Sequence, residues 1–415
     1  MSFSKFQKRF TEHSGIVRLM EDLGDFNSGE ENVLMLGGGN PAHIPEVQQF
    51  LQERLQRISS DPVEFAKIIG NYDPPRGETS FLFDLVKLLN SEYGWALETK
   101  NIALTSGSQS AFFLLFNMYS GEYEDSSRKK ILLPMLPEYI GYSDLGLTEN
   151  QFIARKPIIE KFDDNFFKYH VDFNQLNITS EIGGLCVSRP TNPTGNVLLD
   201  VEMEKLCKLA KENNIPLIID NAYGMPFPNI MFTEAKLMWD NNIVLCMSLS
   251  KFGLPGVRTG IIIANEEIID SIVKMNAILN LSLGSIGPAL VQDIVQSRDI
   301  LHLSNNVIKH YYQRKAILAI DWIKRDLRGI EYYIHKVEGA IFIWLWLPNL
   351  PIRCEALYQR IKQRGVIIVP GNYFFPGLQH DWSHQHEGLR ISYAMHESVV
   401  EQGIKIIGEE IRSLY

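Results

Sequence analysis

Short apolar runs alternate with longer amphipathic stretches between about residues 46 and 285, and this alternation restricts the possible folds more than any other feature. Each run is five or six residues long, which suits a strand that is buried on both faces. Strands of this kind, separated by helices, form a parallel sheet with helices on both faces, so the predicted fold class is α/β. The candidate strands are residues 101–105, 130–135, 184–188, 215–219, 243–248 and 259–264.

A second, smaller α/β domain is expected after Gly287-Pro288. A long amphipathic pattern continues to about residue 325, and shorter strand-like runs and two helical segments follow it. The predicted organisation has three parts. These are an N-terminal segment that packs on the small domain or at the mouth of the site, a large domain and a small domain, at residues 1–45, 46–287 and 288–415.

Residues 247–260 bring an amine and anion-binding side chains to the end of one predicted strand. Ser248, Ser250 and Lys251 follow the apolar run, and Arg258 comes seven residues after the lysine. A desolvated lysine can form a Schiff base with a carbonyl, whereas arginine and hydroxyl groups suit a phosphate dianion. Considered alone, Lys251 could also be an ordinary loop charge, because most lysines are exposed.

Polar residues and turns follow two more of the predicted strands. Gly107, Ser108 and Gln109 would begin a helix, where free amides and the helix dipole favour phosphate. An ordinary helix cap explains that turn equally well. Tyr139 follows the candidate strand 130–135 and could either stack on a flat heteroaromatic ring or pack in the core.

Asn192 and Asp220 each follow or end an apolar run, and Tyr223 comes three residues after the aspartate. Asn192 could be a turn former or could donate to a phenolate oxygen. A carboxylate that ends an apolar strand is costly unless it is paired, and either a pyridinium nitrogen or a following helix would pair Asp220. Ligands of such sheets bind at the carboxyl ends of the strands, where these residues are predicted to lie.

The order and spacing of these residues resemble those of a known family. Asn192 precedes Asp220 by 28 residues, Asp220 precedes Lys251 by 31, and Lys251 precedes Arg258 by 7. The chain resembles the fold-type I pyridoxal-phosphate enzymes and, within them, the aspartate aminotransferase superfamily. The resemblance implies a large domain with a mostly parallel sheet, a smaller C-terminal α/β domain, pyridoxal 5′-phosphate as cofactor and a homodimer. It extends over nearly the whole length, through residues 37–41, 71–77 and 388–393.

The resemblance also implies a role for each candidate residue toward the cofactor. Lys251 would hold the cofactor as a Schiff base and then move the proton at the substrate α-carbon. Asp220 would stabilise the pyridinium, Asn192 and Tyr223 would bind the phenolate oxygen, and Tyr139 would stack on the ring. The phosphate would be held by Gly107, Ser108, Gln109, Ser248, Ser250 and Arg258, helped by Tyr72 from a neighbouring subunit.

Two of these assignments have an alternative. Tyr72 could equally be an anchored loop tyrosine, without any role in a neighbouring subunit. Arg390 is expected to bind the substrate α-carboxylate, because a planar guanidinium matches a carboxylate with two hydrogen bonds, but it could instead form a structural salt bridge. Gly39, together with Gly38 and Asn40, is expected to line the substrate loop from the other side.

A narrower resemblance, to bacterial aminotransferases that act on valine and pyruvate, is carried by motifs such as Ser106–Phe113 and Asp220–Gly224. No second arginine clearly matches the one that dicarboxylate-specific relatives use, so an apolar pocket for valine, alanine or 2-aminobutyrate is expected, with Ile16 or Tyr139 as a wall. One methylene is worth only about 1–3 kcal/mol of discrimination, so the sequence does not rank these substrates. An aromatic, alanine or broad-specificity aminotransferase and a carbon–sulfur β-lyase remain alternatives.

Composition excludes several other classes. A chain of 415 residues with 45% hydrophobic content can bury two domains, and a net charge of −9 argues against a nucleic-acid partner and hence against a DNA-binding sensor. The four cysteines lack metal-like spacing, so they are predicted to be reduced and no metal site is expected. The sequence shows neither a signal-peptide pattern nor an apolar stretch of membrane length, which predicts a soluble, cytoplasmic protein. The resemblance implies that its substrates are small amino acids and 2-oxo acids.

Overall fold

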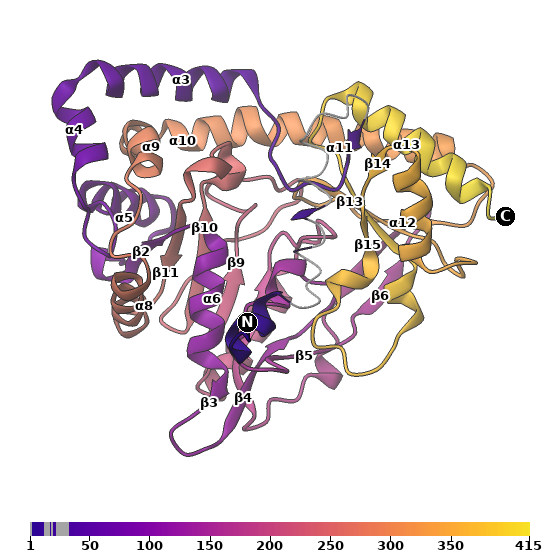
Figure 1. Cartoon of the computed structure of the whole chain (residues 1–415), viewed down its shortest axis with the longest axis horizontal. Helices are drawn as coiled ribbons and strands as arrows, with labels where there is room; N and C mark the ends of the chain where they lie inside the picture. Colours follow the sequence, from indigo (N-terminus) through magenta and orange to yellow (C-terminus); the bar gives the residue numbers. More distant parts are fainter. Residues whose placement is uncertain (1, 12–16, 18–19, 22–32) are drawn as a thin grey trace. The chain divides into compact units, whose positions relative to one another are not determined.

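The computed structural model describes residues 2–11, 17, 20–21 and 33–415 (Figure 1). Contacts within the chain divide it into two compact units, each assembled from separate segments. The first unit contains Met1–Asn40, Phe116–Leu198 and Tyr312–Tyr415, and the second contains Pro41–Leu115 and Leu199–Tyr311. The division into 1–45, 46–287 and 288–415 follows the order of the sequence and stays a prediction.

Four strands lie side by side in the second unit, in the order β2, β11, β10, β9. Their bounds are Ile102–Thr105, Gly260–Ile263, Ile243–Ser248 and Leu217–Asp220, and all of their residues are buried. These bounds confirm four of the candidate strands to within two residues at each end. β9 and β10 are parallel, whereas β11 runs antiparallel to both β10 and β2, so the sheet is of the mixed, mostly parallel kind that the resemblance implies.

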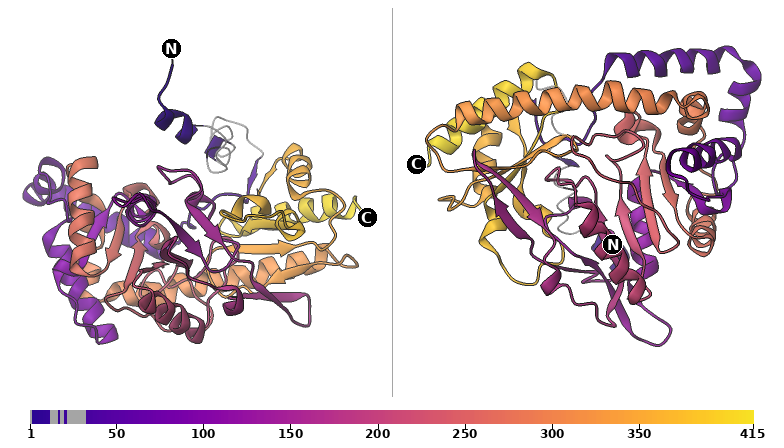
Figure 2. Two further views of the ribbon diagram at one scale, coloured as in Figure 1. Left: turned by 90° about the horizontal axis from the view of Figure 1, so that it is seen from below. Right: turned by 180° about the vertical axis from the view of Figure 1, so that it is seen from behind.

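Helices surround these strands, and local signals fix where several of them begin. Asp61 ends α3 and caps α4, because its carboxylate accepts hydrogen bonds from the amides of Val63 and Glu64 at 2.9 and 3.1 Å. The chain changes direction there, as Figure 1 and the right-hand view of Figure 2 show. The helices of this unit are α3 (Pro45–Ser60), α4 (Pro62–Gly70), α5 (Thr79–Tyr93), α7 (Asp200–Glu212), α8 (Glu266–Leu279), α9 (Ile286–Ser297) and α10 (Asp299–His302). Two further helices, α6 (Ser108–Tyr119) and α11 (Lys309–Asp326), contain the points at which the chain passes between units.

The first unit contains a six-stranded sheet in the order β15, β16, β13, β12, β7, β6. Two of these strands come from the middle of the sequence: β7 (Phe166–His170) pairs with β6 (Ile158–Lys161) on one side and with β12 (Tyr333–His335) on the other. The remaining members are β13 (Phe342–Trp346), β15 (Val369–Pro370) and β16 (Gly388–Ser392). Residues 342–346 and 388–392, which belong to the part of the chain where shorter strands are predicted, therefore form neighbouring strands in the interior of this sheet.

The other strands of the first unit include the two remaining candidates. β4 (Arg128–Leu133) runs parallel to β8 (Ile182–Ser188) and to β5 (Phe152–Ala154), and it forms a hairpin with β3 (Gly121–Glu122). A small pair is made by β1 (Leu34–Met35) and β14 (Val366–Ile367). Helices α12 (Cys354–Gln363) and α13 (Glu397–Arg412) lie side by side, and the chain begins with α1 (Lys5–Thr11) (Figures 1 and 2). Among the helices in the described residues, none has the length and apolarity needed to cross a membrane.

Candidate active site

Lys251 lies just beyond the carboxyl end of β10, in a single turn formed by Ser250–Phe252. Its side chain is half-buried, and its Nζ atom is 5.3 Å from the centre of the Tyr223 ring. Tyr223 is buried and follows β9, the strand parallel to β10. The parallel pairing thus brings the amine and the phenol together at the carboxyl ends of two neighbouring strands, as the sequence predicts.

Asp220 ends β9 and is 9% exposed. Its Oδ1 atom accepts a hydrogen bond of 3.0 Å from the amide of Ala222. Its register partner on β10 is Cys246, and burial together with the negative charge of Asp220 raises the pKa of that thiol. The carboxylate therefore stands in an apolar surrounding, where a cationic partner would be strongly favoured.

The turn before α6 and Arg258, two residues before β11, form a cradle that suits an anion. Gly107 has a φ of +84°, and a Cβ atom placed on it would overlap the guanidinium of Arg258. Gly260 packs against the same turn, since a Cβ there would lie 2.9 Å from the amide nitrogen of Ser108. The arginine thus reaches the first amides of a helix of 12 residues, where the helix dipole also favours negative charge.

The two serines of the predicted phosphate site occupy different surroundings. Ser248 is buried, and its Oγ atom contacts Ser250 Oγ at 2.9 Å and Thr259 O at 3.3 Å. Ser250 is half-buried on the following turn, and its amide donates to Ser248 Oγ at 3.0 Å. Ser248 therefore holds the turn together, and Ser250 is the hydroxyl closer to the surface. Ser108 and Gln109 form the half-buried first turn of α6.

Arg390 and Asn192 lie together in the first unit. Arg390 is 2% exposed in the middle of β16; its Nη1 donates to Asn192 Oδ1 at 2.8 Å and its Nη2 to the carbonyl oxygen of Gly37 at 2.6 Å. Its guanidinium lies 4.1 Å from the ring centre of Phe342 and 5.1 Å from that of Phe374. Because arginine only donates, Asn192 must present its oxygen to Arg390, which fixes the direction of its amide donor.

The remaining candidates are placed as follows. Tyr139 is half-buried in the first unit, and its ring makes an edge contact with Tyr142 at 5.4 Å between centroids. Gly39 is half-buried two residues after Gly37, whose carbonyl accepts from Arg390. Tyr72 is 81% exposed in the second unit. Ile16, the expected pocket wall, lies outside the described residues.

The sequence analysis did not find the aromatic rings and the carbonyl that hold Arg390. Phe342 is spaced as an ordinary core residue of a strand, and Phe374 lies in the turn Gly371–Phe374, so neither has a polar signal. The carbonyl of Gly37 carries no side-chain signal at all. Only the pairing of β13 with β16 shows that Phe342 belongs beside the arginine.

The described residues of the second unit fit pyridoxal 5′-phosphate. The amine of Lys251 can bond to an aldehyde, the cradle of Gly107 and Arg258 suits its phosphate, and the buried Asp220 suits a protonated ring nitrogen. Within the described part of the chain there is no group of three or more histidine, cysteine or acidic side chains that could hold a metal ion.

Known proteins are similar to this chain in sequence and in fold. The family model described as aminotransferase class I and II matches residues 31–407. The valine–pyruvate aminotransferase of Escherichia coli K12 is 52% identical over 414 residues, covering 99% of this chain and 98% of that protein.

Solved structures give the same result. A chain from Psychrobacter arcticum 273-4, provisionally assigned as an amino-acid aminotransferase, is 48% identical with a TM-score of 0.97 and covers 100% of this chain and 99% of its own. The valine–pyruvate aminotransferase of Salmonella typhimurium LT2 is 50% identical with a TM-score of 0.89, covering 96% of this chain and 99% of its own. The chain therefore belongs to the class I and II aminotransferases, enzymes whose cofactor is pyridoxal 5′-phosphate.

Proposed function

We propose that this aminotransferase moves the amino group between L-valine and pyruvate, giving 3-methyl-2-oxobutanoate and L-alanine in two half-reactions of a ping-pong mechanism. The observation that carries the proposal is the 52% identity, over nearly the whole of both chains, to the Escherichia coli enzyme of that name. Because the match covers 99% of this chain and 98% of that protein, a common substrate is the simplest expectation.

The second unit supplies the cofactor's binding groups in this proposal. Arg258, the amides that begin at Ser108 and the hydroxyl of Ser250 hold the phosphate, with Gln109 and Ser248 supporting the same turns. Asp220 keeps the ring nitrogen protonated and Tyr223 donates to the phenolate oxygen. When bound, pyridoxal phosphate supplies a ring that withdraws electrons from the substrate α-carbon. Lys251 would hold the cofactor through its aldehyde carbon and, once its amine is free, would take the proton from the substrate α-carbon as a general base.

The first unit supplies the groups for the substrate in this proposal. Arg390 binds the α-carboxylate with two parallel hydrogen bonds, which its planar fork is shaped to do. The carbonyl of Gly37 and the side-chain oxygen of Asn192 hold that fork in place from the opposite side. Asn192 then directs its amide hydrogen to the phenolate oxygen, Tyr139 stacks on the ring, and Gly39 lines the substrate loop.

A homodimer is part of the proposal, with Tyr72 contributing to the phosphate site of the partner. Tyr72 is 81% exposed, and the hydrogen bonds from Ser282 Oγ and Ser285 Oγ to Asp73, at 2.8 and 2.6 Å, tie its segment to the end of α8. Two further exposed apolar side chains, Val63 and Ile69, lie on α4, and Ile278 and Leu281 lie at the end of α8 and just after it. We call these four residues and Tyr72 the apolar edge and assign them to the contact between two copies, because exposed apolar surface commonly marks an interface.

A cytoplasmic location is also proposed, and the cysteines support it. All four are reduced thiols, and two of them are buried in the strands β8 and β10. Proteins in reducing compartments keep their thiols in this form.

The test is a set of half-reactions on the purified, cofactor-loaded protein. L-Valine, L-alanine, L-aspartate and L-phenylalanine are added separately, and the visible absorbance of the bound cofactor is followed. We expect valine and alanine to remove the band rapidly, and pyruvate to restore it. Loss of the band chiefly with phenylalanine or aspartate would move the substrate assignment to another aminotransferase specificity. Release of ammonia and pyruvate from cystathionine, without any 2-oxo acid acceptor, would indicate a carbon–sulfur β-lyase instead.

A further inference from the structure

The segment that carries Asn192 is an irregular loop without an exposed residue. Every residue from Arg189 to Leu198 is buried, although the loop contains neither helix nor strand. Loops normally lie at the surface, because buried backbone amides and carbonyls must find hydrogen-bonding partners inside the protein. The partners of this loop are therefore part of how Asn192 is held.

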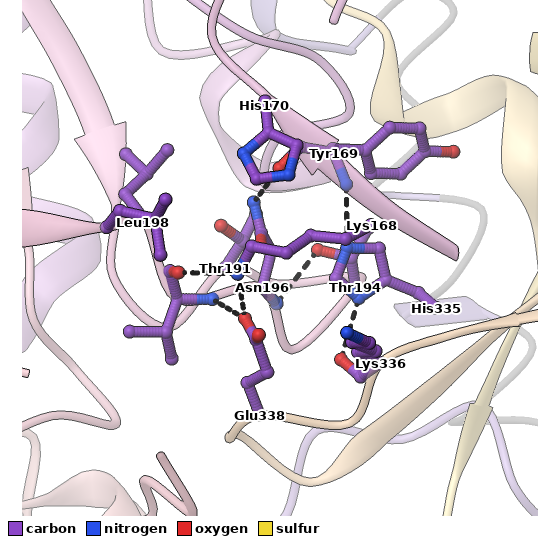
Figure 3. Close-up of polar contacts among 12 residues, drawn as sticks. Lys168, Tyr169, His170, Thr191, Thr194, Asn196, Leu198, His335, Lys336 and Glu338 are labelled. Carbon is purple, nitrogen blue, oxygen red and sulfur yellow. Dashed lines mark hydrogen bonds and ion pairs between the residues drawn. The ribbon is translucent and has the colours of Figure 1, made fainter. Parts of the chain in front are cut away.

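An ion pair between Lys168 and Glu338 satisfies both backbone groups of Val197, near the end of the loop. Glu338 Oε2 accepts from the amide of Val197 at 2.9 Å, and Lys168 Nζ donates to the carbonyl of Val197 at 2.9 Å. The two side chains also bond to each other. Figure 3 shows Lys168 and Glu338 converging on the loop from opposite sides. Together they supply the donor and the acceptor that the backbone of a neighbouring strand would otherwise supply to Val197.

Further contacts hold the middle of the same loop against the same two segments. Asn196 Nδ2 donates to the carbonyl of Tyr169 at 3.2 Å, next to Lys168 on β7 (Figure 3). Gly195 has a φ of +71°, and a Cβ atom on it would lie 2.5 Å from the carbonyl oxygen of Gly339, next to Glu338. The loop is thus fixed along its length by β7 and by the segment that begins at Glu338.

The segment that begins at Glu338 also contacts the strand of Arg390. Two residues after Glu338, the carbonyl of Ala340 accepts from the hydroxyl of Tyr393 at 2.7 Å, just beyond the end of β16. Arg390 and Asn192 meet through the 2.8 Å bond between them. Residues 338–340 therefore contact both of the elements whose side chains form that bond.

We propose that Lys168 and Glu338 are positioning residues, which set the place of Asn192 and, through it, of Arg390. This inference rests on the proposed function of Asn192 and Arg390. Glu338 holds the loop by accepting from Val197 and Lys168, and Lys168 holds it by donating to Val197. In this proposal the two residues act through the loop and not on the substrate or the cofactor.

General energetics favour positioning over a purely stabilising role. Taking two charges out of water costs several kcal/mol per ion, and replacing a buried ion pair with apolar residues of equal volume is often neutral or stabilising. An apolar pair would, however, leave the amide and carbonyl of Val197 without partners. The ion pair therefore allows the loop to be buried, because it provides hydrogen-bonding partners for the amide and the carbonyl of Val197.

The test compares four variants with the wild-type holoenzyme. Glu338→Ala removes the acceptor, Lys168→Met removes the donor, and Glu338→Gln keeps an acceptor oxygen for both partners. Arg360→Met is the matched control, because it breaks the ion pair with Glu410 between α12 and α13 in the same unit, at 3.0 Å, without contacting the loop. The measurements are the melting temperature, KM and kcat of the valine half-reaction, the dissociation constant of pyridoxal phosphate for the apoprotein, and the pH midpoint of the bound cofactor's visible band.

We expect Glu338→Ala to raise KM for valine about 10- to 100-fold, since a displacement of about 1 Å in such a site costs on that order. Because Asn192 stabilises the deprotonated phenolate, the pH midpoint should rise by about one unit. Lys168→Met should show the same changes in smaller degree, and Glu338→Gln should recover most of the wild-type values. Arg360→Met should lower the melting temperature and leave KM and the midpoint unchanged.

Unchanged KM and midpoint in both Glu338→Ala and Lys168→Met would overturn the inference and leave the proposed function intact. The same conclusion would follow if Arg360→Met changed KM and the midpoint as much as Glu338→Ala does. If Glu338→Ala does not fold, Lys168→Met against Glu338→Gln decides in the same way. A wild-type protein that shows no visible cofactor band, or no loss of the band with any amino acid, would overturn the proposed function and this inference together.

Discussion

At the scale of single residues, Gly107 shows how one missing atom makes room for a charge. It has a φ of +84°, and a Cβ atom added to it would overlap the Arg258 guanidinium. Gly107→Ala should therefore push the arginine away from the first amides of α6. We expect the affinity of the apoprotein for pyridoxal phosphate to fall at least about tenfold, the value of one charge-assisted hydrogen bond.

A fluorescence titration of the apoprotein measures this affinity. Gly284→Ala is the control, because a Cβ there meets nothing within 4 Å and the residue has no positive φ. Adding Arg258→Met to Gly107→Ala should weaken binding little further, since both changes remove the same contact. Additive losses would show that the glycine acts by some route other than the arginine.

His335 offers a second test at this scale, on stability instead of binding. Its Nε2 accepts from the amide of Tyr169 at 3.2 Å, and its Nδ1 donates to the carbonyl of Lys336 at 2.8 Å, so the ring is neutral. Burial, followed by the charge of Lys168, lowers the pKa of His335 to about 3. The unfolded chain takes up a proton below about pH 6.5 and the folded chain does not, so this histidine makes stability fall as the pH drops from 6.5 toward 3.

The contribution is at most about 1.4 kcal/mol per pH unit. In His335→Gln, the free energy of unfolding measured by urea at pH 7, 6 and 5 should fall less steeply with acid than in the wild type. The slope will not vanish, because burial also lowers the pKa of His384 to about 3. His302→Gln is the control, since His302 is exposed on α10. An identical slope in His335→Gln and the wild type would contradict the prediction.

Much of the candidate site could be predicted from the sequence, because its polar residues follow apolar runs. Lys251 and Asp220 each stand at the end of an apolar run, where a polar side chain is conspicuous, and the structure places both at carboxyl ends of strands. Lys168 and Glu338 could not be found in this way. Lys168 lies between aromatic residues in a strand and Glu338 precedes a glycine, and only the folded loop shows that both serve Val197.

At the scale of elements, the loop 189–198 depends on close approach between two backbones. Gly195 combines a φ of +71° with a 2.5 Å distance from a hypothetical Cβ to Gly339 O, whereas Gly329 has a φ of +87° and nothing within 4 Å. Gly329→Ala should therefore cost only the strain of the left-handed conformation, about 1–2 kcal/mol. Gly195→Ala should cost clearly more and should also raise KM for valine, because the loop must shift. Urea unfolding and half-reaction kinetics measure the two effects; equal costs with an unchanged KM would contradict this account.

Hydrophobic runs predicted the strands well but not their directions or partners. The six candidate runs all contain a strand, because a buried strand needs few residues other than isoleucine, leucine and valine. Nothing in residues 260–263 says that β11 runs antiparallel to β10. Likewise, β7 comes from residues 166–170 and yet pairs with β12, beyond residue 330, and packing selects this partner where the local sequence gives no signal.

At the scale of the whole molecule, the order of the sequence and the grouping of contacts differ. The first unit takes segments from the beginning, the middle and the end of the chain, whereas the predicted domains are continuous along the sequence. Composition changes little across these segments, and long-range strand pairing leaves no periodic signal where one unit gives way to the other. The apolar edge is different, because exposed side chains such as Ile278, at 83%, are costly only in the absence of a partner.

The apolar edge predicts that two copies associate and that Tyr72 acts in the partner's site. Tyr72→Ala and Lys251→Ala should each be nearly inactive alone, since every site lacks either the tyrosine or the lysine. Co-expression gives mixed dimers in which one site has both defects and the other has neither. If half of the dimers are mixed, activity should recover to about a quarter of the wild-type value. Recovery should disappear when Ile278→Asp is added to both chains and persist with Val201→Asp, a control at an exposed apolar residue of α7. No recovery in stable mixed dimers would mean that Tyr72 serves its own subunit.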